Sequence, residues 1–173
     1  MQQNNKKSVF TTREIATIGL MASLLEAVKL LLQSIPNVEL VTLFIILFTL
    51  YLGPKTLIAI WAFVGLECVV YGFGLWTIMY IYIWPVLALL TLLFRKEKSK
   101  WPFVILSTMF GLLFGAMCSI PYFFIGGAAT AIAWWISGIP YDILHGVANF
   151  VIAFILFDPL NKLLNKIKLA TME

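Results

Sequence analysis

Long apolar runs, separated by short polar or helix-breaking stretches, cover almost the whole chain. Each run is close to the length that a helix needs to cross a bilayer, about 20 residues. The runs are continuous and do not alternate between apolar and polar positions, which favours membrane helices over the strands of a barrel. Six spans are predicted, at about 15–35, 38–52, 56–73, 75–94, 101–125 and 139–157. The expected fold is therefore an all-α integral membrane bundle of six transmembrane helices, forming one domain over residues 1–173.

Proline and glycine mark several boundaries between the predicted spans. Pro36-Asn37 follows the first span, and Gly53-Pro54-Lys55 follows the second. Proline interrupts a helix because it lacks an amide donor and clashes with the preceding turn. The stretch 126–138 is apolar and contains Trp134-Trp135. We interpret it as a broken connection before the last span.

The basic residues indicate how the bundle is oriented. The chain has 12 lysines and arginines and a net charge of +4, and only Lys29 among them lies inside a span. The other eleven lie at the N-terminus, at Lys55, in 95–100 or in the C-terminal tail. Cytoplasmic loops carry the excess of lysine and arginine, so six spans with both termini in the cytoplasm satisfy the pattern. The charge is thus a topology signal, and no nucleic-acid partner is expected.

Composition excludes a water-soluble globule. Hydrophobic residues make up 62% of the chain, charged residues 12%, and the mean hydropathy is +0.99. Spans and short connections use up the length, which leaves no room for a soluble catalytic domain. No small-residue cleavage site ends the first apolar run, so we expect a retained span in a multi-pass protein of the plasma membrane.

Five acidic or basic side chains lie in the first, third and last predicted spans. They are Glu26, Lys29, Glu67, Asp142 and His145. Each costs about 2.5–3.5 kcal/mol at the centre of a bilayer, so such groups usually face a cavity or a partner. At a rise of about 1.5 Å per residue, all five fall in the outer half of the membrane. Their shared depth predicts a ligand cavity that opens outward.

Helical spacing arranges these groups into polar stripes. The first span carries a stripe with i, i+3, i+7 spacing that ends at Gln33, and the sixth carries one that ends at Asn149. With the aromatic side chains at the outer ends, the predicted substrate-binding residues are Glu26, Lys29, Gln33, Glu67, Tyr71, Trp76, Tyr141, Asp142, His145 and Asn149. Each residue alone also has an ordinary interpretation. Glu26 can pair with Lys29, Asp142 can cap a helix, and the aromatics can form an interfacial belt.

The pattern favours binding over catalysis. The sequence has no phosphate-binding glycine loop, no metal-ligand spacing and no nucleophile–base spacing, so we expect no enzyme activity, no cofactor and no metal. Cys68 and Cys118 are interpreted as packing residues in apolar surroundings. Aromatic rings can stack on a planar heterocycle, and the polar stripes can orient it by hydrogen bonds.

A second face of the first span carries small side chains. They are Thr12, Ala16, Gly19, Ser23 and Ala27. This small-residue stripe lies about 90° from the polar stripe, and small residues let helices approach closely in lipid. Its partner is either another protein or a helix of the same bundle. In the fifth span Gly111, Gly115 and Ser119 form a competing stripe.

Three segments of the sequence resemble segments of a known protein family. They are Pro36-Asn37-Val38-Glu39-Leu40, Tyr71-Gly72-Phe73-Gly74-Leu75-Trp76, and Gly138-Ile139-Pro140-Tyr141-Asp142 leading to His145 and Asn149-Phe150. With six short spans and the small-residue stripe, the whole chain resembles the substrate-binding (S) component of an energy-coupling factor (ECF) vitamin transporter. The resemblance implies vitamin capture from outside, and docking on a transmembrane coupling protein driven by two ATPase subunits. The first helix of that family commonly carries Ala-x-x-x-Ala; Gly19-x-x-x-Ser23-x-x-x-Ala27 stands in the corresponding place.

The sequence alone does not decide which of several vitamins is the ligand. One basic group, Lys29, stands against several acidic side chains, which favours a neutral or weakly basic ring over a polyanion. Hydroxymethylpyrimidine or a pyridoxine-like ring fits best within the family, and pantothenate, with a carboxylate for Lys29, and cobalamin stay open. The alternative class is a self-sufficient small secondary transporter or channel, although no inverted second half is visible in the sequence.

Overall fold

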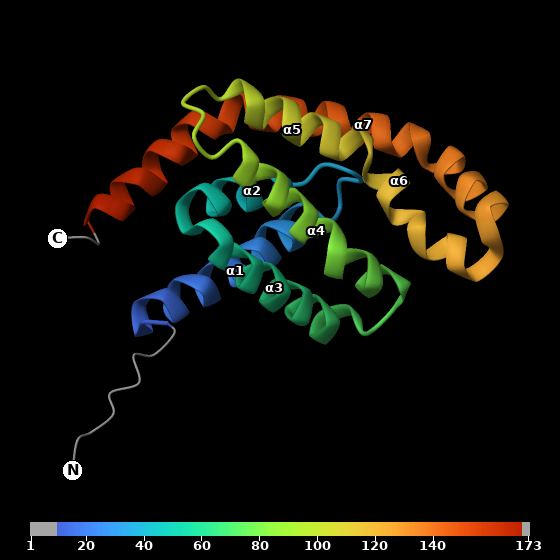
Figure 1. The fold of residues 1–173 in the computed structure, drawn as a ribbon, viewed down its shortest axis with the longest axis horizontal. Helices are drawn as coiled ribbons and strands as arrows, with labels where there is room; N and C mark the ends of the chain where they lie inside the picture. The colour runs from blue at the N-terminus through green and yellow to red at the C-terminus, as the bar shows by residue number, and fades with distance from the viewer. Residues whose placement is uncertain (1–9, 171–173) are drawn as a thin grey trace, which may run out of the picture.

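The computed structural model describes residues 10–170, and no strand occurs among them. The elements are α1 (Thr12–Leu32), α2 (Val41–Leu52), the 3-10 turn η1 (Gly53–Lys55), α3 (Thr56–Tyr71), α4 (Leu75–Leu93), α5 (Trp101–Leu112), α6 (Phe114–Cys118) and α7 (Ile120–Ala170). Figure 1 shows these helices in chain order. The prediction of an all-α fold is confirmed.

Four helical stretches of the described chain are long and apolar enough to cross a membrane. They are Thr12–Leu32, Val41–Tyr71, Leu75–Leu93 and Ile120–Ile167. Such helices are those of a membrane protein. This length criterion gives four spans where the sequence pattern predicts six, because α2 and α3 count as one stretch and α5 is short.

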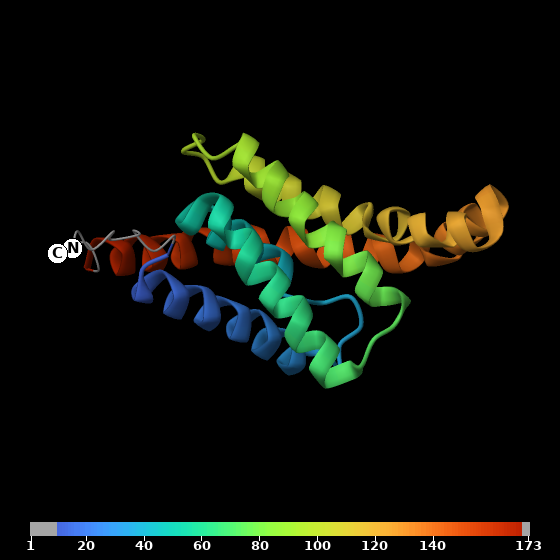
Figure 2. The same cartoon turned by 60° about the horizontal axis from the view of Figure 1, so that its bottom comes forward.

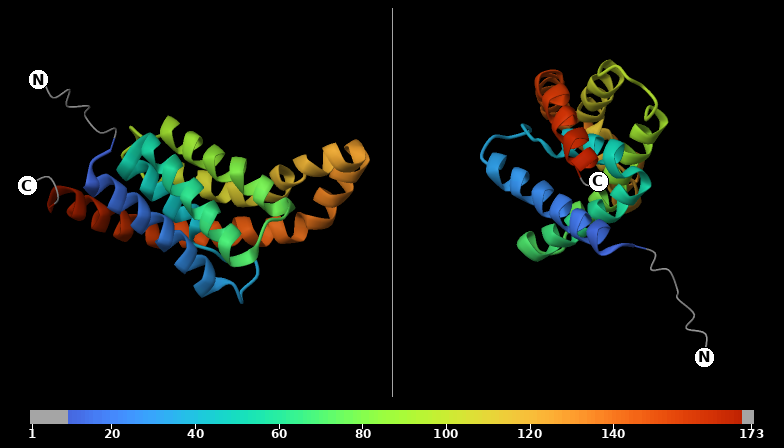
Figure 3. Two further views of the ribbon diagram at one scale, coloured as in Figure 1. Left: turned by 90° about the horizontal axis from the view of Figure 1, so that it is seen from below. Right: turned by 90° about the vertical axis from the view of Figure 1, so that its left-hand side faces the viewer.

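The helices run back and forth along one long axis. The start of α1, the turn η1, the α4–α5 connection and the end of α7 lie at one end of the bundle (Figure 3, left). The α1–α2 loop, the α3–α4 connection and the first turns of α7 lie toward the other end. Helix α5 packs along α7, and α1 packs along α3, as Figures 1 and 2 also show. We call the end that contains η1 the η1 end, and the end that contains the α1–α2 loop the loop end.

The stretch 126–138 corrects the sequence prediction of a broken connection. It is helical except at Gly126 (φ −139°) and Gly127 (φ +76°), and the helix then continues without interruption to Ala170. Glycine alone adopts a positive φ without steric cost, so Gly127 allows the chain to reverse here. Across the hairpin, Trp134 stacks on Tyr122 with ring centroids 4.7 Å apart. The predicted span 139–157 is therefore the middle of a much longer helix.

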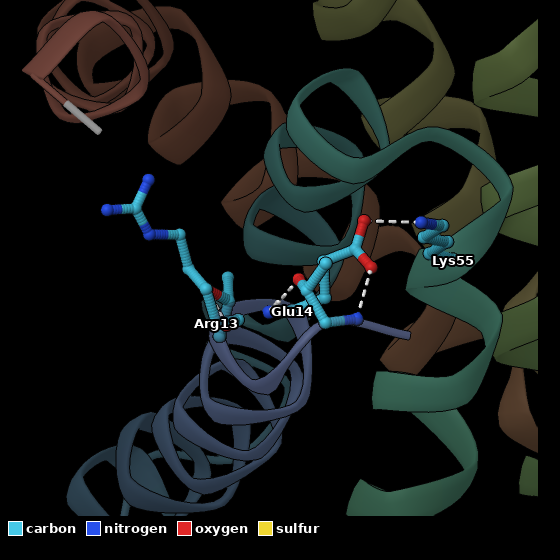
Figure 4. Close-up of polar contacts among 5 residues, drawn as sticks. Arg13, Glu14 and Lys55 are labelled. Carbon is cyan, nitrogen blue, oxygen red and sulfur yellow. Dashed lines mark hydrogen bonds and ion pairs between the residues drawn. The ribbon is translucent and has the colours of Figure 1, made fainter. Parts of the chain in front are cut away.

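Polar contacts tie α1 to the α2–α3 turn at the η1 end. Thr11 and Glu14 form a capping box, in which the Glu14 N–H donates to Thr11 Oγ1 at 3.2 Å. The Glu14 carboxylate also pairs with Lys55 of η1 (Figure 4). Above Gly53, a Cβ atom would lie 3.1 Å from the Arg95 guanidinium, so a second basic residue covers the same turn. Basic side chains from two connections thus gather at one end of the bundle.

Candidate functional site

A cavity of about 270 Å³ opens at the loop end, between α1, the α1–α2 loop, α4, α6 and α7. Its polar lining comes from Lys29, Gln33, Asn37, Glu39 and His145. The remaining lining residues are Leu32, Ile35, Pro36, Val38, Val41, Tyr80, Trp84 and Phe114. The cavity therefore combines charged and amide groups with aromatic and aliphatic walls.

Lys29 is held from several sides at the edge of this cavity. Its ammonium forms an ion pair with Glu67 of α3, whose side chain is 1% exposed. The same nitrogen lies 4.9 Å from the ring centroid of Tyr71 and 5.1 Å from that of Tyr80, which are cation–π distances. The ion pair of Lys29 is therefore with Glu67 on the neighbouring helix, and not with Glu26 on its own helix.

Glu39 and His145 form a second charged contact in the cavity lining. Glu39 Oε1 lies 3.2 Å from His145 Nε2, and Glu39 Oε2 accepts the Thr42 N–H at 2.8 Å in the first turn of α2. Burial alone would raise the pKa of Glu39, but the hydrogen bonds from His145 and Thr42 outweigh it and lower that pKa. Glu39 is thus a carboxylate at neutral pH.

An aromatic ladder runs between these two charged contacts, and its members Tyr80, Trp84 and Phe114 line the cavity. Trp76, Tyr80 and Trp84 follow each other on α4, with ring centroids 5.5 and 5.4 Å apart in edge-to-face contact. Phe114 of α6 continues the ladder, 5.6 Å from Trp84, and touches the His145 ring at 5.1 Å. These rings offer apolar surface to a planar ligand beside groups that form hydrogen bonds.

Most of the predicted residues on α1 and α3 meet at one place. Lys29 and Gln33 line the cavity, and the Tyr71 hydroxyl donates to Gln33 Oε1 at 3.3 Å. Glu67 pairs with Lys29, and the Trp76 ring lies 6.0 Å from the same ammonium. Glu26 is buried on α1 one turn before Lys29, and neither of its carboxylate oxygens accepts a hydrogen bond.

The three residues of the predicted polar stripe on α7 contact three different neighbours. His145 lines the cavity, whereas Asp142 Oδ1 accepts the Gly115 N–H at 2.8 Å beside the α5–α6 break. Asn149 Nδ2 donates to the carbonyl of Ser107 at 3.3 Å. Tyr141 is 60% exposed and does not line the cavity. Asp142 lies inside α7, so it does not cap that helix.

Sequence reasoning missed most residues of the cavity wall, among them Glu39, Trp84 and Phe114. Glu39 is the clearest, because it is an acidic residue beside Asn37 at the edge of an apolar run, and that position is itself a signal. Helix α2 begins only at Val41, so the preceding residues form a loop that folds over the cavity. Trp84 and Phe114 had no distinguishing signal among the many aromatics of the chain.

The arrangement can bind and orient a small molecule. Within the described residues, no group of three or more His, Cys, Asp or Glu side chains could hold a metal ion. In comparisons with known proteins, no family model, no curated protein and no solved structure matches this chain. The function must therefore be argued from the cavity and its chemistry.

Proposed function

We propose that this chain is the substrate-binding component of an energy-coupling factor vitamin transporter. It crosses the plasma membrane six times, keeps both termini in the cytoplasm and captures a small water-soluble molecule from outside. The observation that carries the proposal is a polar, aromatic-walled cavity at one end of an apolar helical bundle. Between this cavity and η1 the bundle is filled by buried side chains such as Phe48 and Phe63.

The size and charge of the cavity narrow the ligand class. Cavities for drug-sized ligands measure roughly 300–1,000 Å³, so a volume of about 270 Å³ suits a single ring. Cobalamin is far too large for it. The charge of Lys29 is already matched by Glu67, which leaves little attraction for the carboxylate of pantothenate. A hydroxymethylpyrimidine or pyridoxine-like ring is the best candidate.

The small-residue stripe of α1 is free to contact a coupling protein. Ala16, Gly19, Ser23 and Ala27 are all exposed, and a Cβ atom at Gly19 would meet no atom within 4 Å. The competing stripe on α5 behaves differently, because a Cβ atom at Gly111 would lie 2.9 Å from the backbone of α7. The α5 stripe is thus used inside the bundle, which supports docking through α1.

Mass spectrometry of small molecules that co-purify with the wild-type chain tests the proposal. We expect a polar compound with one ring, and at least a tenfold lower yield with His145→Ala, since an unpaired buried partner costs about 1–3 kcal/mol. Glu14→Ala changes an ionisable residue at the η1 end and serves as the control, with an unchanged yield. A large or polyanionic ligand, or equal yields from all three proteins, would contradict the proposal.

Cysteine labelling on intact cells tests the topology. Cysteines at Ser34, Phe73 and Ala128, all exposed near the loop end, are expected to react with a membrane-impermeant thiol reagent. Cysteines at Lys96 and Ser99 in the α4–α5 connection are expected to react only after the cells are opened, because lysine-rich loops stay in the cytoplasm. Labelling at Ser99 on intact cells would reject the six-span topology.

A further inference from the structure

Two buried glutamates leave three oxygen atoms without a donor. Glu26 on α1 is 7% exposed and Glu67 on α3 is 0% exposed. Both carboxylate oxygens of Glu26 and Oε1 of Glu67 are buried and accept no hydrogen bond, whereas Oε2 of Glu67 is bonded to Lys29. A buried polar atom without a partner is costly, and a buried charge costs more. The packing of α1 along α3 therefore requires a donor at this point.

The charges around the two glutamates do not balance. Glu26 interacts electrostatically with Glu67 and with Lys29, so two acids share one cation. The other titratable groups that face them are the phenols of Tyr71 on α3 and Tyr80 on α4, which are neutral at physiological pH. Beyond Tyr80 lie Glu39 and Cys118, and the stretch 41–50 of α2 has no ionisable side chain. With both acids ionised, the cluster would carry one net negative charge in an apolar interior.

We propose that Glu26 and Glu67 bind one proton between them, and that Glu26 carries it as a neutral carboxylic acid that donates a hydrogen bond to Glu67 Oε1. Glu67 keeps its charge because its other oxygen is paired with Lys29. The proton turns one Glu26 oxygen into a donor for Glu67 Oε1, which gives a partner to two of the three atoms, and it makes the cluster neutral. Glu26 is then a positioning residue, because it fixes Glu67, which in turn holds Lys29 at the cavity edge. This inference does not depend on the identity of the ligand.

Infrared spectroscopy of the full chain in lipid nanodiscs tests the assignment. A protonated carboxyl group absorbs apart from carboxylates and amides, so the spectrum of the wild type minus that of Glu26→Gln is expected to contain a protonated-carboxyl band at neutral pH. Glu14→Gln is the matched control on the same helix, and its difference spectrum is expected to lose a carboxylate band instead. A lost carboxylate band for Glu26→Gln would overturn the proposal.

Thermal unfolding in detergent at several pH values gives a second test. Glutamine mimics the neutral acid and can donate its amide N–H to Glu67, so Glu26→Gln is expected to unfold near the wild-type midpoint and Glu26→Ala well below it. An unfolded glutamate loses its proton near its ordinary pKa of about 4.3, whereas the folded pair keeps the proton to higher pH. Wild-type stability therefore falls as pH rises above that value until the folded pair releases the proton, and Glu26→Gln removes that part of the slope. Parallel pH slopes for wild type and Glu26→Gln would overturn the proposal.

The same assay distinguishes a proton from a metal cation. Replacing choline chloride by sodium chloride at constant ionic strength is expected to leave the wild-type midpoint unchanged. Sodium-dependent stabilisation that is absent from Glu26→Gln would show that a metal cation occupies the pair, and would overturn the proposal. If Glu26→Gln does not fold, a pH titration of the protonated-carboxyl band in the wild type still decides, because a band that does not respond to alkaline pH cannot come from this proton.

Discussion

Replacing Glu67 by alanine is expected to lower the free energy of unfolding by about 3 kcal/mol and to weaken ligand binding more than tenfold. The substitution removes the carboxylate that is bonded to Lys29 beside the rings of Tyr71 and Tyr80, and neither oxygen of Glu26 is bonded to that ammonium. Breaking a buried ion pair costs about 3–5 kcal/mol, and the lower end applies because the Lys29 side chain is 27% exposed. Unfolding in mixed detergent micelles, followed by tryptophan fluorescence, measures the loss.

Another ion pair, at the η1 end, gives a matched control. Glu14 pairs with Lys55 at the exposed η1 end, where such pairs contribute little. Glu14→Ala should therefore leave both unfolding and ligand binding close to wild type. The double variant Glu67→Ala with Lys29→Met should recover part of the lost stability, because the unpaired charge is removed with its partner. Equal effects of Glu67→Ala and Glu14→Ala would mean that the inner pair contributes no more than a surface pair.

The sequence predicted the helical fold because membrane helices are defined by local composition. Apolar runs and proline or glycine breaks are visible one segment at a time, and the ends of α1, α2, α3 and α4 fall within three residues of the predicted limits. The hairpin within α7 could not be predicted in the same way. Gly126 and Gly127 do signal a break, but the resumption of helix immediately afterwards depends on contacts across the hairpin, such as Trp134 on Tyr122.

The sequence predicted the candidate site best at the charged residues inside the apolar spans, because a charge there needs a partner or a cavity. Depth in the membrane identified Glu67 and Lys29 as one group, and the structure pairs them. Helical phase was a weaker guide, because it shows that Asp142 and His145 share a face but not which neighbour each will meet. One meets the backbone of Gly115 and the other meets Glu39 in the α1–α2 loop. The path of a loop depends on tertiary packing, so that second partner could not be assigned from spacing alone.

Gly19→Leu is expected to abolish vitamin uptake by cells while leaving ligand binding by the purified chain unchanged. The small-residue stripe is exposed, and Gly19 has no atom near its Cβ position, so a leucine there disturbs no contact inside the bundle. The added side chain would hold a docking helix away, because close approach of membrane helices depends on small residues. Uptake in cells that supply the coupling module, paired with a titration of the purified chain, measures both effects.

Two leucine substitutions at other positions serve as controls for Gly19→Leu. Ala62→Leu adds the same kind of bulk on an exposed face of α3 and should leave uptake intact. Gly111→Leu forces a side chain against the backbone of Gly146 and should reduce folding, binding and uptake together. If Gly19→Leu behaves like Ala62→Leu, the coupling protein docks on another face; if it behaves like Gly111→Leu, the stripe packs within the bundle. Transport by the purified wild-type chain without any ATPase would reject the energy-coupling factor proposal in favour of a secondary transporter, because a binding component alone has no source of energy for the transport step.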